Sequence, residues 1–200
     1  MSSVKSLDNR DAPIALVDLG DTLCDCTPAL REGLARLRGQ GESAHEEDLV
    51  PLPAHLESRR RKVMERAGFW RALPPRALGF EILALLQRSG FRVYVLTKGP
   101  RDAPHVWAEK VAWCRAHLPG VPVIVTDDKA VVYGSVLVDD WLPYIQHWQR
   151  RWRTGRVIVP AQPWNAQVLA EPGYVRYDGS NGEEVVALLK GVVAAKRVEP

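Results

Sequence analysis

The chain has 200 residues, of which 46% are hydrophobic and 26% charged, and its formal net charge at pH 7 is +3. This length allows one core domain with a small inserted lobe. The small, dispersed charge argues against a nucleic acid polymer as partner. The longest apolar runs are far shorter than the ~20 residues of a membrane helix, so we expect no membrane association. Three cysteines without metal-ligand spacing, preceded by no apolar signal segment, predict a reducing, cytoplasmic setting.

Strands and helices alternate along the chain. The first strand is predicted at Ile14 to Val17, an apolar run with β-branched ends that leads directly into Asp18. After it we expect helices over residues 28–38, 55–67 and 77–88, a strand over 91–96, a helix over 104–117, strands over 121–126, 135–138 and 156–159, and a helix over 183–196.

This alternation predicts an α/β fold with a parallel sheet covered by helices on both faces, as in Rossmann-like domains. The segment over residues 24–75 is too long for a simple crossover between two strands. We therefore expect a small helical cap at 24–75, inserted after the first strand, and a core domain made of residues 1–23 and 76–200.

Polar residues follow the predicted strands where the strands end. Asp18, Thr97, the segment near Lys129 and the pair Asp139-Asp140 all take such positions. The carboxyl ends of parallel strands meet at one edge, which is where open α/β sheets bind ligands. Two or three carboxylates in one pocket repel each other unless a cation lies between them, so a hard cation such as Mg²⁺ is implied.

The run Asp18-Leu-Gly20-Asp21-Thr22, followed in order by Thr97, a lysine and Asp139-Asp140, resembles the four motifs of the haloacid dehalogenase superfamily of phosphohydrolases. The resemblance implies that Asp18 is the nucleophile and also a metal ligand. It implies that Thr97 and the adjoining Lys98 bind the phosphate, and that Asp139 and Asp140 complete the Mg²⁺ site.

Within that superfamily the chain is similar to the 5'(3')-deoxyribonucleotidase family. The similarity rests on Thr97-Lys-Gly-Pro, Glu109-Lys110-x-x-Trp113, Thr126-Asp-Asp-Lys129 and Leu137-Val-Asp139-Asp140. It implies Lys110 as first choice for the third-motif cation, with Lys129 as second. It also implies that Phe69 and Trp70 of the cap face the base of a nucleotide, although the same pair could be plain cap core.

The second position after the nucleophile departs from the family pattern. Relatives carry there an aspartate that acts as general acid and base, whereas this chain has Gly20 and places its carboxylate one residue later, at Asp21. Gly20 can still offer its backbone carbonyl to the metal. General acid/base assistance, worth ~10²–10⁴-fold, depends on Asp21 or on water.

Three functions follow from this departure. The first is a Mg²⁺-dependent phosphomonoester hydrolase that acts on a small phosphorylated metabolite, foremost a (deoxy)nucleoside 5'-monophosphate, through an aspartyl phosphate. The others are a catalytically silent nucleotide-binding protein and a phosphotransferase.

Two further questions stay open in the sequence. Trp148 and Trp152 lie four apart on a basic helix and pack either against the sheet edge or against a partner subunit in a homodimer. The loop at residues 160–165 either is a rigid loop with no role in the site, or it brings Trp164 and Asn165 to the active-site edge.

Overall fold

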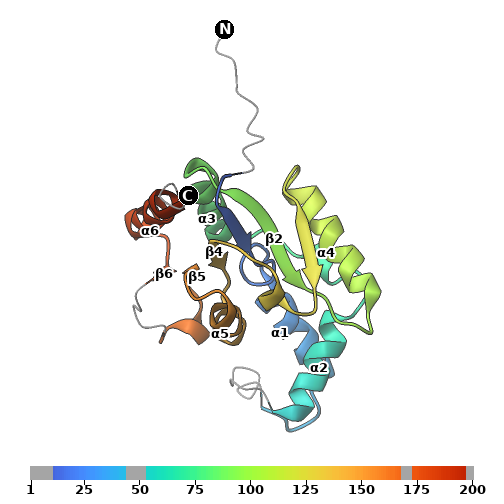
Figure 1. Cartoon of the computed structure of the whole chain (residues 1–200). Helices are drawn as coiled ribbons and strands as arrows, with labels where there is room; N and C mark the ends of the chain where they lie inside the picture. The colour runs from blue at the N-terminus through green and yellow to red at the C-terminus, as the bar shows by residue number, and fades with distance from the viewer. Residues whose placement is uncertain (1–10, 44–52, 168–172, 197–200) are drawn as a thin grey trace.

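The structure, a computed structural model, describes residues 11–43, 53–167 and 173–196 (Figure 1). Within these residues six parallel strands form one sheet in the order β3-β2-β1-β4-β5-β6. The strands are β1 (Ile14–Val17), β2 (Arg92–Lys98), β3 (Val123–Thr126), β4 (Val136–Val138), β5 (Arg156–Pro160) and β6 (Tyr174–Tyr177). The α/β parallel-sheet fold predicted from the sequence is confirmed.

Successive side chains of each strand enter opposite layers of the core. Ala15 and Val17 join the layer that contains α3 (Ala77–Arg88), α4 (Pro104–His117) and α6 (Gly182–Lys196), whereas Leu16 joins the layer that contains α5 (Leu142–Arg151). Apolar side chains on both faces are typical of a parallel sheet between helices. Among the described helices, none is both long and apolar enough to cross a membrane.

Two helices, α1 (Cys26–Leu37) and α2 (Ala54–Met64), lie together beyond the edge at which the strands end (Figure 1). They approach closely at Gly33, where an added Cβ would lie 2.4 Å from Val63 Cγ1. The chain leaves and re-enters the core through adjacent segments, because Asp25 N–H donates to Pro74 O at 2.9 Å and Arg76 N–H donates to Leu23 O at 2.8 Å.

This arrangement suits a small cap with two adjoining connections, although the division into core and cap stays a prediction. Residues 1–10, 44–52, 168–172 and 197–200, which the predicted domains include, lie outside the described residues.

One observed strand, β6, was not predicted from the sequence, and several predicted helices and strands end at other residues than expected. β6 is an edge strand that pairs only with β5 among the described strands, and its short half-buried sequence gave a weak signal. β2 runs on to Lys98 because Thr97 and Lys98 still pair with β3. Thr97 is therefore the second-last residue of a strand, not the first residue after one.

Candidate active site

Three buried carboxylates form the centre of the candidate site. Asp18 follows β1, and Asp139 and Asp140 follow the neighbouring strand β4. One oxygen from each lies within 4.8 Å of the others. Burial raises the pKa of Asp139 to about 6, although Lys129 opposes the shift, and burial together with the charges of Asp139 and Asp18 raises the pKa of Asp140 well above its usual range. Such an oxygen donor set fits a hard divalent cation such as Mg²⁺.

Lys129 is the cation in contact with this cluster. Its Nζ donates to Asp18 Oδ1 at 2.6 Å and to Asp139 Oδ2 at 2.7 Å, and its side chain is 3% exposed. Burial acts to lower its pKa, but the charges of Asp139 and Asp18 outweigh burial, so the pKa of Lys129 is raised. Lys129 therefore keeps its proton beside the candidate nucleophile.

Lys110 enters the site from α4 and contacts different groups. Its Nζ donates to Thr97 Oγ1 at 3.1 Å and to Lys98 O at 2.6 Å. Burial lowers the pKa of Lys110 to about 8, with the charge of Asp18 acting in the opposite direction. These contacts favour Lys129 over Lys110 as the cation beside Asp18, the reverse of the order expected from the sequence.

The Asp21 carboxylate is hydrogen-bonded at the start of α1. Its backbone adopts a left-handed φ of 52°, and its Oδ1 accepts the N–H groups of Cys26 and Thr27, both at 2.9 Å. The carboxylate thus binds the first N–H groups of α1, where a negative charge is favourable. Burial raises its pKa, and these hydrogen bonds only partly offset the shift. Asp21 thus stabilises the start of a helix in this structure, and its expected catalytic role stays a prediction.

The space beside Gly20 is filled by Trp70. A Cβ added to Gly20 would lie 3.5 Å from Cys26 Sγ and from two carbons of the Trp70 ring, which is ordinary van der Waals contact. The Gly20 backbone is not left-handed, because its φ lies outside the range that other residues rarely adopt. An acidic side chain at this position would therefore have to share its space with an indole.

Trp70 is held firmly against α4 and is only 4% exposed. Its Nε1–H donates to Met64 O at 2.9 Å, its backbone N–H donates to Glu109 Oε2 at 3.2 Å, and Lys110 Nζ lies 3.7 Å from its ring centroid. The Trp70 ring is covered in this arrangement, and its expected stacking on a nucleotide base stays a prediction. Phe69 packs edge-on against Trp70 and is only partly buried, so its role as a base contact stays a prediction.

Two side chains orient the Asp140 carboxylate, and of these only Thr22 was not among the site residues considered from the sequence. Thr22 Oγ1 donates to Asp140 Oδ1 and Trp164 Nε1 donates to Asp140 Oδ2, both at 3.1 Å. Asn165 Nδ2 donates to the Asp140 backbone carbonyl at 3.1 Å. The loop after β5 thus reaches the active-site edge, which was one of the two possibilities in the sequence. Thr22 could have been found, because it lies within the first motif.

Tyr144 of α5 is an aromatic residue at the site that the sequence did not indicate. Its ring centroid lies 4.7 Å from Lys98 Nζ and 5.2 Å from Lys129 Nζ. Burial raises the pKa of Tyr144, while the charges of Lys129 and of Arg60 on α2 oppose the shift. Tyr144 is thus a partly exposed ring among cations of the core and the cap.

Trp148 and Trp152 pack within the subunit. The indole N–H of Trp148 donates to Val132 O at 3.0 Å, and that of Trp152 donates to Ala130 O at 2.9 Å. Both acceptors belong to the turn that begins with Lys129. The two tryptophans therefore support the Lys129 turn, and they give no indication of a partner subunit.

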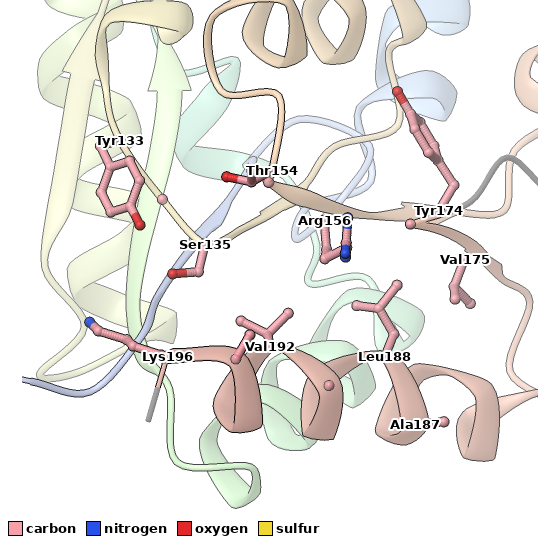
Figure 2. Close-up of a pocket in the computed structure, with 15 residues that line it drawn as sticks. Tyr133, Ser135, Thr154, Arg156, Tyr174, Val175, Ala187, Leu188, Val192 and Lys196 are labelled. Carbon is pink, nitrogen blue, oxygen red and sulfur yellow. The ribbon is translucent and has the colours of Figure 1, made fainter. Parts of the chain in front are cut away.

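A separate pocket of about 680 Å³ lies at the opposite edge of the sheet (Figure 2). It is formed by the chain before and at the start of β4, β5 and β6 together with α6, and Figure 2 shows Leu188 and Val192 of α6 facing Arg156. Ligands of open α/β sheets bind at the carboxyl ends of the strands. This pocket is therefore distinct from the candidate active site.

Taken together, the parallel sheet and its carboxyl edge, with an acidic cluster and two lysines, form a fold of the haloacid dehalogenase type. Among solved structures, the chain is similar to a haloacid dehalogenase-like hydrolase of Burkholderia xenovorans, with a TM-score of 0.52 and 18% identity over 89% of this chain and 98% of that one. A haloacid dehalogenase-like family hydrolase of Xanthomonas campestris gives a TM-score of 0.51 and 13% identity over 94% and 99%. At such identities the likeness concerns the fold alone.

A comparison of the sequence with models of protein families is more specific than the likeness of fold. The model of the family described as 5' nucleotidase, deoxy (pyrimidine), cytosolic type C protein matches residues 12–174. Because this match takes in most of the chain, the protein belongs to that family and is a nucleotidase-like phosphatase of the haloacid dehalogenase type. Comparison with curated protein sequences gives no match.

Proposed function

We propose that the protein is a Mg²⁺-dependent phosphomonoesterase that acts on a (deoxy)nucleoside 5'-monophosphate. The observation that carries this proposal is the position of Asp18. Its carboxylate lies at the carboxyl end of a central strand, in contact with the Lys129 ammonium and grouped with Asp139 and Asp140. A carboxylate in this position is a suitable nucleophile for a phosphoryl group that the neighbouring cations hold in place.

The residues divide the reaction between them. Thr97 and Lys110 bind the non-bridging phosphate oxygens, and Lys129 keeps Asp18 oriented while it neutralises charge on the phosphoryl group. Asp18 attacks phosphorus and forms an aspartyl phosphate, which water then hydrolyses. The Gly20 carbonyl and the carboxylates of Asp18, Asp139 and Asp140 would hold Mg²⁺, which when bound neutralises the acidic cluster and the transferring group.

The direct test is an assay of the purified protein with a panel of nucleoside 5'-monophosphates and Mg²⁺. We expect phosphate release that disappears in Asp18→Asn and on removal of Mg²⁺. Thr97→Val is expected to raise KM more than it lowers kcat. Absence of phosphate release from every substrate, or full activity in Asp18→Asn, would refute the proposal.

A silent nucleotide-binding protein is the second candidate, and the absence of a carboxylate at Gly20 together with the helix-start role of Asp21 favours it. It predicts that a nucleoside monophosphate with Mg²⁺ raises the melting temperature while no phosphate is released over hours. A phosphotransferase predicts, in contrast, that an added alcohol or nucleoside acceptor becomes phosphorylated faster than phosphate is released.

We also propose a cytoplasmic location and leave a homodimer as a prediction. The three thiols, Cys24, Cys26 and Cys114, are free and buried, which suits a reducing compartment. Size-exclusion chromatography with light scattering tests the oligomeric state.

A further inference from the structure

The reaction proposed above needs a proton for its leaving group, and the usual donor is missing from this chain. A nucleoside alkoxide is a poor leaving group, so its departure from phosphorus depends on a proton at the ester oxygen. Gly20 has no side chain, and the Asp21 carboxylate is hydrogen-bonded to the start of α1. Lys129 donates to Asp18 and Asp139, which leaves it directed at the nucleophile and the acidic cluster.

Lys110 is a protonated side chain that lies close to this position. The Trp70 indole, whose edge fills the space beside Gly20, also carries the Lys110 ammonium 3.7 Å from its ring centroid. The same Nζ donates to the hydroxyl of Thr97 at 3.1 Å. The Trp70 ring therefore contacts both the Lys110 ammonium and the space beside Gly20. The ammonium is also hydrogen-bonded to Thr97, which binds the phosphate in the proposed reaction.

The surroundings hold Lys110 in this position. Glu109, the preceding residue of α4, accepts the backbone N–H groups of Gly68 at 2.6 Å and of Trp70 at 3.2 Å. Trp113, one turn further along α4, donates its indole N–H to Leu73 O at 2.7 Å. The segment that carries Trp70 is thus fixed to the same helix as Lys110, and the ring and the ammonium keep their relative positions.

We infer that Lys110 is the general acid and base of this site and replaces the aspartate that Gly20 lacks. The inference rests on the proposed phosphomonoesterase activity and adds a catalytic role to a residue otherwise expected only to bind phosphate.

The proton transfers balance over the two steps. As an oxygen of Asp18 bonds to phosphorus, the bond from phosphorus to the ester oxygen breaks, and that oxygen keeps the electron pair and takes a proton from the Lys110 ammonium. The neutral Lys110 amine then takes a proton from the water that attacks the aspartyl phosphate. The bond between phosphorus and Asp18 breaks, which releases phosphate, a free Asp18 carboxylate and a protonated Lys110.

The electrostatic surroundings suit this exchange. Burial lowers the pKa of Lys110 to about 8, so the group can both release and take up a proton near neutral pH. Asp18, Cys26 and Cys24 face Lys110 and act to raise its pKa, whereas Lys129 acts to lower it. The hydrogen bonds of Lys110 go to Thr97 and Lys98, and none goes to a candidate metal ligand.

The test compares two leaving groups in Lys110→Arg, a variant that keeps the positive charge but cannot release a proton at the pH of the assay. Single-turnover release of nitrophenolate from p-nitrophenyl phosphate needs no proton, so it is expected to fall only by the loss of phosphate binding that the change at Lys110 causes, and by less than nucleoside release. Single-turnover release of the nucleoside from a nucleoside monophosphate is expected to fall ~10²-fold or more. Lys190→Arg on the exposed side of α6 is the matched control and is expected to change neither rate.

A second measurement uses the wild-type protein and does not depend on the folding of a variant. Nucleoside release is expected to fall as pH rises through the pKa of Lys110, and the midpoint should equal the pKa measured for the Lys110 Nζ by NMR titration. Equal losses for both leaving groups in Lys110→Arg, or a kinetic midpoint unrelated to the NMR value, would overturn this inference alone. Absence of turnover with either ester in the wild type would overturn the proposed function as well.

Discussion

Removal of the Lys129 ammonium is the sharpest perturbation of the acidic cluster. Lys129 makes two buried ion pairs, at 2.6 Å with Asp18 and 2.7 Å with Asp139, and its side chain is 3% exposed. Removing one partner of a buried pair leaves an uncompensated charge and typically costs ~3–5 kcal/mol. Methionine has a similar length and fits a long narrow site. We therefore expect Lys129→Met to lose ~3–5 kcal/mol of unfolding free energy in the absence of metal.

The assay is urea denaturation of wild type and Lys129→Met, each with a chelator and with saturating Mg²⁺. Mg²⁺ should stabilise the variant more than the wild type, because the Lys129 ammonium no longer competes with the metal for Asp18 and Asp139. For comparison, a ligand at a hundred times its Kd stabilises a protein by ~2.7 kcal/mol. A substantial part of the loss should therefore be recovered.

Arg36→Met is the matched control, because it breaks a pair with Glu32 in which the side chains are 61% and 67% exposed. Such a pair contributes at most ~1 kcal/mol. If Lys129→Met loses no more than this control, and if Mg²⁺ stabilises variant and wild type equally, the cluster does not depend on Lys129 and the reasoning is wrong.

Three further predictions concern packing, the motif loop and pH. Gly79→Ala should lose ~1–3 kcal/mol or more in urea denaturation, because its Cβ would lie 1.9 Å from the backbone oxygen of Thr22, whereas Gly191→Ala, with nothing within 4 Å, should gain ~0.5–1 kcal/mol. Gly20→Asp should keep its Mg²⁺ affinity in calorimetric titration and hydrolyse poor leaving groups faster, because the Gly20 backbone is not left-handed; loss of metal binding would mean that the loop needs glycine. Without metal, the raised pKa of Asp139 gives a stability contribution that is present at low pH and lost as pH rises through about 6. The melting temperature should therefore fall between about pH 4 and above pH 6, and Mg²⁺ should remove this trend. A melting temperature that rises over this range would contradict the raised pKa of Asp139.

The sequence by itself determined the fold class and the edge of the sheet at which the site residues meet. Apolar strands such as Ile14–Val17, separated by helices with one apolar face, leave a parallel sheet between helices as the favoured arrangement. Parallel strands in turn bring Asp18 and Asp139-Asp140 to one edge. These features depend on local patterns repeated along the chain, and a single sequence contains them.

Only the tertiary structure decided how the side chains at that edge are used. Lys129 and Asp18, which are hydrogen-bonded, are 111 positions apart in the chain. The hydrogen bond from Trp164 to Asp140 depends on how the loop after β5 packs against the active-site edge. No local pattern fixes such contacts, because they depend on the packing of elements far apart in sequence. Asp21 differs, because its carboxylate accepts N–H groups only five and six positions further along the chain, although its adjacency to the motif suggested catalysis.

Trp70 illustrates the physical reason most directly. Its position in the cap predicted a base contact, but α4 binds its backbone through Glu109 and its ring through Lys110. The indole lies beside Gly20, where an added Cβ would be 3.5 Å from two of its ring carbons, and the ammonium lies over the indole because α4 brings it there. The sequence identified Gly20, Trp70 and Lys110 as candidate site residues, but only the packing of α4 against the cap segment brought them into contact.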